Sequence, residues 1–166
     1  AVTLTGVTAG HLLVVCIAWG NASTVSSVAG NSNTYTSCGA PRVDGTSGTI
    51  AMYYVKNSNS GSTTVTVTFS ADPGVGLMTV QEYSGTDTSA PLDQYTTNSQ
   101  FNVTGANNTT SGAVTTTTNG QVIVGLVFDD ALAGGNYTQG TGFTERHDIG
   151  DGDTEDQIQT SAGSIA

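Results

Sequence analysis

Residues 64–69 read Thr-Val-Thr-Val-Thr-Phe, so that threonine and apolar residues alternate. A period of two residues is the pattern of a β-strand with one buried and one solvated face. We therefore expect Val65, Val67 and Phe69 to point into a core and the threonines to face water. No stretch of the chain has the apolar spacing of an amphipathic helix, so this alternation indicates the fold class.

Further strand-like runs recur at short intervals, separated by clusters of Gly, Asn, Asp and Ser. They are residues 49–56, 76–83, 112–117 and 141–146. Residues 25–28 and 34–38 flank a turn at 29–32 and are expected to form a hairpin. Roughly ten short strands predict an antiparallel β-sandwich, jelly-roll or immunoglobulin-like, in a single domain that spans residues 1–166.

Two runs are apolar on both faces, namely residues 11–19 (HLLVVCIAW) and 122–128 (VIVGLVF). A two-layer sandwich buries one face of each strand, so the second face needs a further cover. Loops or an edge strand of the same chain are one alternative, and another subunit is the other. The second alternative predicts subunit contacts through Leu13, Val15, Ile17, Trp19 and Val127.

The charge of the chain excludes some partners. It has 3 basic and 13 acidic side chains, for a formal net charge of −10. Nucleic acids and anionic membrane surfaces require clustered Lys and Arg, so neither is expected as a partner. No apolar run reaches the ~18 residues of a membrane-spanning helix, so membrane insertion is not expected. The composition, rich in Thr, Ser and Asn, is typical of extracellular bacterial proteins and predicts a secreted, cell-surface protein.

The sequence lacks several common catalytic motifs. The chain has no Gly-x-Ser-x-Gly elbow, no phosphate-binding glycine loop and no His-Glu-x-x-His. Glu82 could face inward from its strand, but no second acid is its evident partner for glycoside cleavage. We therefore expect a non-enzymatic protein with no catalytic residues and no required cofactor.

The densest acidic stretch is residues 148–156 (DIGDGDTED). Calcium takes about six to eight oxygen ligands, and alternating Asp and Gly allows a loop to wrap them around one ion. This predicts a calcium site built from Asp148, Asp151, Asp153 and Glu155. A solvated acidic turn between two strands is the alternative.

The chain has 2 cysteines, Cys16 and Cys38. They could join neighbouring strands by a disulfide, or they could be two buried free thiols. Their spacing does not indicate a zinc site.

Two further kinds of surface site follow from residues in loop-like sequence. Tyr95 and Tyr137 are candidates for stacking against sugar rings, which makes a carbohydrate-binding module the alternative function. Asn-x-Ser/Thr sequons, the acceptor sites of N-linked glycans, occur at Asn21, Asn102, Asn107, Asn108 and Asn136.

Several segments follow one another in a fixed order across nearly the whole chain. They are Gly10-His11-Leu12-Leu13-Val14-Val15, Asn33-Thr34-Tyr35-Thr36, Tyr54-Val55-Lys56-Asn57, residues 64–69, Glu82-Tyr83-Ser84-Gly85, Pro91-Leu92-Asp93, Gly142-Phe143-Thr144-Glu145-Arg146 and Thr154-Glu155-Asp156. Together they resemble an uncharacterised family of secreted bacterial jelly-roll modules, found in large surface proteins of acidobacteria and similar groups. The resemblance implies the fold and secretion, and it carries no catalytic residues.

Two features depart from that family pattern. The family has no cysteine pair at positions 16 and 38, and it continues by another strand or two beyond a segment such as Ser164-Ile165-Ala166. A sandwich without its last strands has unpaired backbone groups, which a strand from a neighbouring copy would pair. Because a head-to-tail contact that does not close gives a filament, we expect a structural or adhesive subunit of an extracellular filament assembled by strand exchange.

Overall fold

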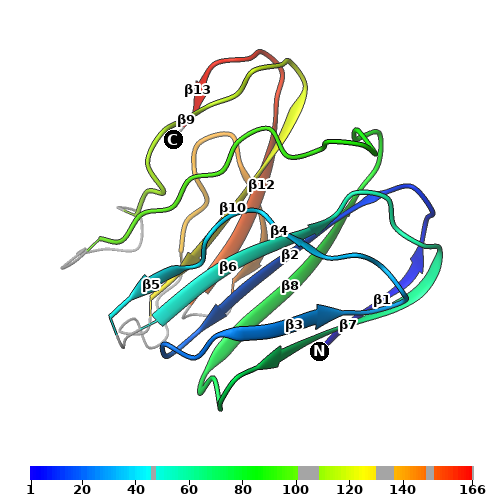
Figure 1. Ribbon diagram of the computed structural model, residues 1–166. Helices are drawn as coiled ribbons and strands as arrows, with labels where there is room; N and C mark the ends of the chain where they lie inside the picture. Colours follow the sequence, from blue (N-terminus) through cyan, green and yellow to red (C-terminus); the bar gives the residue numbers. More distant parts are fainter. Residues whose placement is uncertain (46–47, 101–108, 130–136, 149–151, 166) are drawn as a thin grey trace. The chain divides into compact units, whose positions relative to one another are not determined.

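The computed structural model of the chain describes residues 1–45, 48–100, 109–129, 137–148 and 152–165. These residues form thirteen strands and no helix, and all paired strands are antiparallel (Figure 1). The predicted all-β antiparallel, sandwich-like fold is thereby confirmed. The chain divides into two compact units, Ala1–Leu92 and Asp93–Ala166, so a single domain over 1–166 stays a prediction.

The first unit consists of two sheets that pack around two clusters of buried apolar side chains. One sheet has the strand order β1-β7-β3, and the other has the order β4-β6-β2-β8, with β5 also paired with β6. The core side chains come from both sheets, as in a β-sandwich. The strands of this unit are β1 Val2–Val7, β2 Leu12–Trp19, β3 Val25–Ala29, β4 Thr36–Ser37, β5 Arg42–Asp44, β6 Gly48–Val55, β7 Gly61–Phe69 and β8 Gly76–Tyr83.

Strand β7 contains the alternating stretch and has the two faces that the alternation predicts. Val65 is completely buried, and Val67 and Phe69 pack against the same core. The threonines at 64, 66 and 68 are exposed. Apolar alternation therefore placed this strand correctly, with its inward face toward the opposite sheet.

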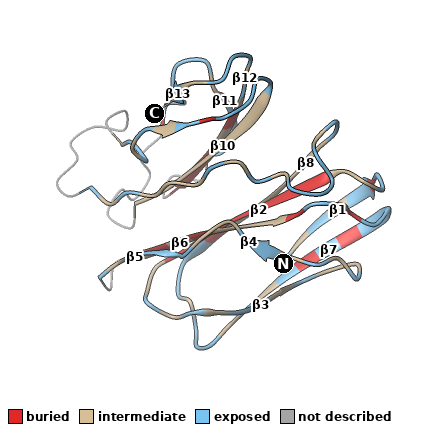
Figure 2. Cartoon of the chain, turned by 45° about the horizontal axis from the view of Figure 1, so that its top comes forward, coloured by how far each residue is buried: buried red, intermediate tan, exposed pale blue. Residues whose placement is uncertain are grey.

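Strand β2 is the central element of the larger sheet. It pairs with β6 on one side and with β8 on the other, and all of its residues are buried (Figure 2). Trp19 lies in the core with its ring centroid 5.1 Å from that of Phe69, and its Nε1 donates a hydrogen bond to the carbonyl oxygen of Ser23 at 2.9 Å. This hydrogen bond satisfies the indole N–H, which would otherwise be costly to bury.

The burial of β2 corrects an expectation about subunit contacts. Val15, Ile17 and Trp19 form the main core with Ala51 and Val65 of the same unit. Leu13 packs with Val7 and Val55 in a second cluster. These four β2 side chains are enclosed within the first unit, so they are not available to a neighbouring subunit.

The predicted hairpin of residues 25–28 and 34–38 is wrong. Strand β3 pairs with β7, whereas β4 pairs with β6 in the other sheet. The intervening turn has positive φ at Asn31 and Ser32, and the Asn31 side chain donates to the carbonyl oxygens of Asn59 and Ser60. Long-range hydrogen bonds therefore hold this turn as a crossing between sheets rather than as a local reversal.

The second unit contains a three-stranded sheet of order β10-β12-β11 and a two-stranded sheet of β9 and β13. Within the acidic stretch 148–156, Asp148 ends β11 and residues 152–156 belong to β12. Residues 149–151, between the two strands, lie outside the described residues, so the acidic turn stays a prediction. Cross-strand pairing on both sides of β12 overrides the low β-propensity of Asp and Gly. The strands are β9 Val114–Thr115, β10 Gln121–Phe128, β11 Thr144–Asp148, β12 Gly152–Gln159 and β13 Ser164–Ile165.

Candidate functional site

Strand β10 is a long, regular strand at the edge of its sheet. It pairs with β12 over its whole length, from Gln121 opposite Gln159 to Phe128 opposite Gly152, without a register shift. Within the described part of the chain no other strand pairs with β10, and all of its residues are partly exposed. Every second residue of an edge strand points its backbone N–H and C=O away from the sheet. One side of β10 is therefore unpaired in this sheet.

The other edge strands of comparable length have features that discourage pairing. Register shifts interrupt β1, β3 and β11. Three of the five residues of β11 are also charged, and β8 contains the acidic Glu82. Bulges and charges are common means by which proteins protect sheet edges. Among these described edges, β10 alone combines a regular register with the absence of charge.

Four carboxylates line one face of the sheet next to β10. In the β11–β12 pairing, Asp148 lies opposite Asp153 and Glu145 lies opposite Glu155. Residues directly opposite in an antiparallel pair share a face, and like charges in such positions are destabilising. This face therefore concentrates negative charge.

Two of these carboxyl groups have raised pKa values. Asp153 is 3% exposed, and its Oδ1 atom has no hydrogen-bond partner among the described residues. Burial, together with Glu145, Glu155 and Asp148, raises the pKa of Asp153 to about 6. Burial also raises the pKa of Glu155, although the Gly140 N–H that donates to it has the opposite effect.

The side chain of Glu155 extends over the neighbouring strand β10. A Cβ atom at Gly125 would lie 2.9 Å from Cγ and 3.1 Å from Oε1 of Glu155. Because glycine has no Cβ, the Glu155 side chain can occupy this position without a clash. On the same side, the Gly140 N–H donates a 2.7 Å hydrogen bond to Oε2 of Glu155. Two glycines thus accommodate this carboxylate above the middle of β10. Gly125 was the available sequence signal, because an isolated glycine in a strand often marks a close approach.

The opposite face of this sheet carries a bidentate ion pair. Arg146 donates from Nε and Nη2 to the two carboxylate oxygens of Asp156, at 2.8 and 2.7 Å. Asp156 is 5% exposed, so the guanidinium compensates a charge that would be costly to bury alone. Arg146 therefore stabilises β11 against β12 on the face away from Glu155.

The predicted calcium ligands lie on strands rather than in a wrapping loop. Asp148, Asp153 and Glu155 share the acidic face described above, whereas Asp151 lies outside the described residues. In the described ranges, no three His, Cys, Asp or Glu residues are grouped in a way that could hold a metal ion. Calcium binding stays a prediction.

The two cysteines are free thiols, which is the second of the two alternatives left open by the sequence. The Cys38 N–H donates to the carbonyl oxygen of Met52, and Met52 lies opposite Cys16 in the β2–β6 pairing. One strand therefore separates the two thiols, which places their Cα atoms about 10 Å apart, beyond the ~7 Å reach of a disulfide. Burial raises the pKa of Cys16 to about 12 and that of Cys38 to about 11, which favours the protonated thiol over the nucleophilic thiolate at both positions.

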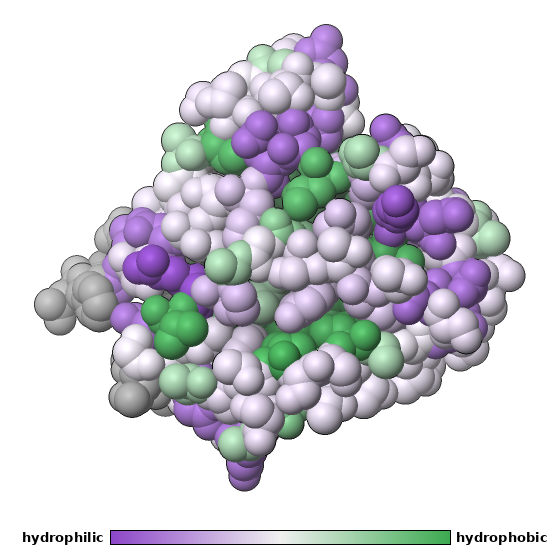
Figure 3. Space-filling model, viewed as in Figure 1, coloured by the Kyte–Doolittle hydropathy of each residue, from purple (hydrophilic) through white to green (hydrophobic). Residues whose placement is uncertain are grey.

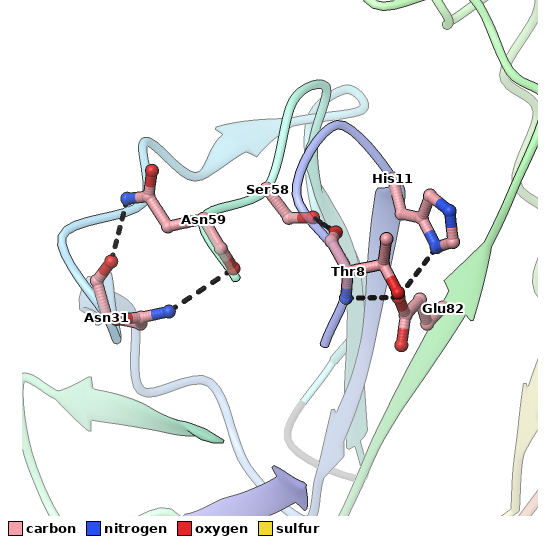
Figure 4. Close-up of polar contacts among 6 residues, drawn as sticks. All are labelled: Thr8, His11, Asn31, Ser58, Asn59 and Glu82. Carbon is pink, nitrogen blue, oxygen red and sulfur yellow. Dashed lines mark hydrogen bonds and ion pairs between the residues drawn. The ribbon is translucent and has the colours of Figure 1, made fainter. Parts of the chain in front are cut away.

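A polar network in the first unit links several turns (Figure 4). Glu82 Oε1 accepts a hydrogen bond from the Thr8 N–H at 2.9 Å and lies 2.7 Å from His11 Nδ1. Ser58 Oγ donates to the Thr8 carbonyl oxygen. The side-chain amide of Asn59 donates to the backbone carbonyl oxygen of Asn31, and the side-chain amide of Asn31 donates to that of Asn59. These contacts tie the β1–β2 turn to β8 and to the turn after β6, so Glu82 has a structural role that its strand position alone did not indicate.

The tyrosine and sequon predictions have different outcomes. Tyr137 is 5% exposed, so it is not a surface platform for a sugar, and Tyr95 is half-buried. The Asn21 amide donates to the Asp72 carbonyl oxygen at 2.8 Å and accepts from the Ser23 N–H. Glycosylation of Asn21 stays a prediction. The sequons at Asn102, Asn107, Asn108 and Asn136 lie outside the described residues.

The face drawn in Figure 3 has several separate groups of apolar residues among polar ones. The described large apolar side chains with the greatest exposure are dispersed along the sequence: Val43, Val75, Leu92 and Ile158. None of the described residues belongs to a helix long and apolar enough to cross a membrane.

Comparison with protein families, with curated proteins and with solved structures finds no match to this chain. The resemblance to secreted jelly-roll modules therefore stays a prediction.

Proposed function

We propose that this chain is a non-enzymatic structural or adhesive subunit, secreted to the cell surface, which associates with further copies of itself through the outer edge of β10. The observation that carries the proposal is the regular, uncharged edge of β10, which is paired only with β12 among the described strands. Such an edge can accept a strand from another chain by ordinary backbone hydrogen bonding.

Strand β10 has no charged residue of its own to oppose contact between copies. Two copies that each have a net charge of −10 repel one another at most surfaces. Strand β10 contains no charged residue, so a strand pairing with it meets no like charge within the strand itself. The half-buried Val127, the remaining member of the predicted contact set, lies in this strand.

The type of assembly depends on which strand pairs with β10. Pairing with a different edge of the next copy propagates into a filament, whereas pairing of two β10 strands gives a closed dimer. The filament inferred from the sequence corresponds to the first arrangement. The carbohydrate-binding alternative loses support because Tyr137 is buried.

The proposal is tested on the complete chain by light scattering and electron microscopy over a range of concentrations. Hydrogen exchange then identifies the strand that is involved. We expect association, with slowed exchange at alternate amides of β10. A chain that is monomeric at every concentration, or whose association leaves β10 amides unprotected, would contradict the proposal.

A further inference from the structure

The uncharged edge of β10 has one charge placed over it by its neighbour. The Glu155 side chain crosses from β12 to lie above Gly125, near the middle of β10. The hydrogen bond from the Gly140 N–H holds its carboxylate on this side. The charge above β10 therefore belongs to a residue of the neighbouring strand and is not evident from the sequence of β10.

An incoming strand would meet this carboxylate. A residue that pairs with Gly125 from outside the sheet would have its Cβ roughly 5 Å from the Gly125 position and on one of the same two faces. Gly125 shares its face with Glu155, so the side chain of that residue would lie against the Glu155 carboxylate. Pairing would then remove water from an ionised group, which is costly without a compensating charge.

Among the described residues, no positive charge faces Glu155 on this side, and the Gly140 N–H donates a hydrogen bond to it. The charged groups that face it are Asp153 on its own strand and Glu145 and Asp148 on β11. Strand β10 contributes none, and Arg146 binds Asp156 on the opposite face. A second copy would bring the same acidic groups, because the two copies have one sequence.

We propose that Glu155 guards the β10 edge: its negative charge opposes pairing with a second copy, and neutralising that charge strengthens the pairing. The inference rests on the proposed function, which supplies the partner and the edge. It adds that one side chain outside β10 sets the affinity between copies. Inward-placed charge is an established way of protecting a sheet edge, and here it would be adjustable.

The test compares two variants of the complete chain that each lose one negative charge. Glu155→Gln keeps the length of the side chain and an oxygen that can accept the Gly140 N–H. Glu145→Gln, the matched control, removes a charge from the same cross-strand pair on β11, a strand farther from the β10 edge. Both variants relieve the same like-charge pair, but only the first removes the charge above Gly125.

Sedimentation at neutral pH measures the dissociation constant between copies for the three chains. We expect Glu155→Gln to lower this constant by about tenfold or more relative to the unmodified chain, because pairing would then no longer bury an ionised carboxylate. Glu145→Gln should remain within about threefold of the unmodified chain, as a distant charge in water contributes little. Hydrogen exchange of the associated Glu155→Gln chain should show protection at β10.

The possible outcomes distinguish a failure of the proposed role of Glu155 from a failure of the proposed function. Association through β10 that is equally strong in the unmodified chain and in Glu155→Gln would overturn the guard and leave the function standing. An equal gain in both variants would also overturn the guard, because net charge would then be the cause. No association of the unmodified chain at any concentration would overturn the proposed function itself, whatever the two variants do.

Discussion

Strands β2 and β10 have similar sequences and opposite positions. Each has eight residues, none of them charged, and each is apolar on both faces. Strand β2 has β6 and β8 as partners and is completely buried, whereas β10 has β12 as its described partner and is partly exposed throughout. A strand sequence that is apolar on both faces therefore indicates that both faces are covered at least in part. It does not indicate whether one or two strands pair with its edges.

The largest effect that tests this comparison is expected from a matched pair of isoleucines. Ile17 of β2 is 1% exposed and lies in the core, whereas Ile123 of β10 is half-buried. Ile17→Ala should lower the free energy of unfolding by about 2–5 kcal/mol because it leaves a cavity in close-packed surroundings. Ile123→Ala should cost about 1 kcal/mol.

Urea unfolding measures both isoleucine variants, with fluorescence of Trp19 for the first unit and circular dichroism for the second. Equal losses would mean that β10 is enclosed as completely as β2, and the comparison would fail.

A second effect concerns the pH dependence of stability that arises from Asp153, which lies on β12 on the same face as Glu155. The pKa of Asp153 is raised from 3.8 to about 6, first by burial and then by Glu145, Glu155 and Asp148. The folded state therefore favours the protonated form. The associated stability is fully present below about pH 4 and is lost as the pH rises through about 6, on the order of 3 kcal/mol in all.

The variant Asp153→Asn isolates this contribution, because every other carboxyl group is unchanged. The stability difference between the variant and the unmodified chain, from urea unfolding, should shift in favour of the variant between about pH 4.5 and about pH 7.5. A difference that is independent of pH would show that Asp153 is ionised in the folded protein over this whole range.

A third effect compares what a lysine does in β10 and in β2. Lysine on an edge strand is a common block to strand pairing. We expect Ile123→Lys, added to Glu155→Gln, to weaken association between copies by about tenfold while the chain remains folded. In β2, Ile17→Lys should unfold the first unit. Sedimentation and circular dichroism measure both, and undiminished association of the Ile123→Lys chain would place the contact elsewhere.

The smallest effect is expected at Cys38. Since Met52 separates it from Cys16, Cys38→Ser should change the free energy of unfolding by less than about 1 kcal/mol. A reducing agent should leave the melting temperature of the unmodified chain unchanged. Thiol counting after denaturation checks the same point, and the loss of both thiols to a disulfide would contradict the strand order.

Local pattern was sufficient for much of the fold. Apolar alternation identified β7 and its inward face, and continuous apolar runs identified β2 and β10. It failed where distant pairing outweighed local preference. Gly152–Gln159 is acidic and polar, but it forms the central strand of its sheet because β10 and β11 pair with both of its sides.

The candidate site was predictable only in part. Val127 and the acidic residues around Asp153 and Glu155 stood out in the sequence, because an apolar run and a dense acidic stretch are local features. The contribution of Glu145 was not evident, since its closeness to Glu155 depends on the β11–β12 register. The approach of Glu155 to Gly125 likewise joins strands that are about thirty residues apart.

The sequence by itself determined that the chain is built of antiparallel strands, which of their faces are apolar, and that the chain is strongly acidic. These properties depend on residue type and on a spacing of two, and both can be read locally. The tertiary structure alone decided that β2 is central and β10 lies at an edge, that Cys16 and Cys38 are one strand apart, and that Glu155 lies over Gly125. The physical reason is that strand order and register are fixed by hydrogen bonds between residues far apart in the chain, which local pattern does not encode.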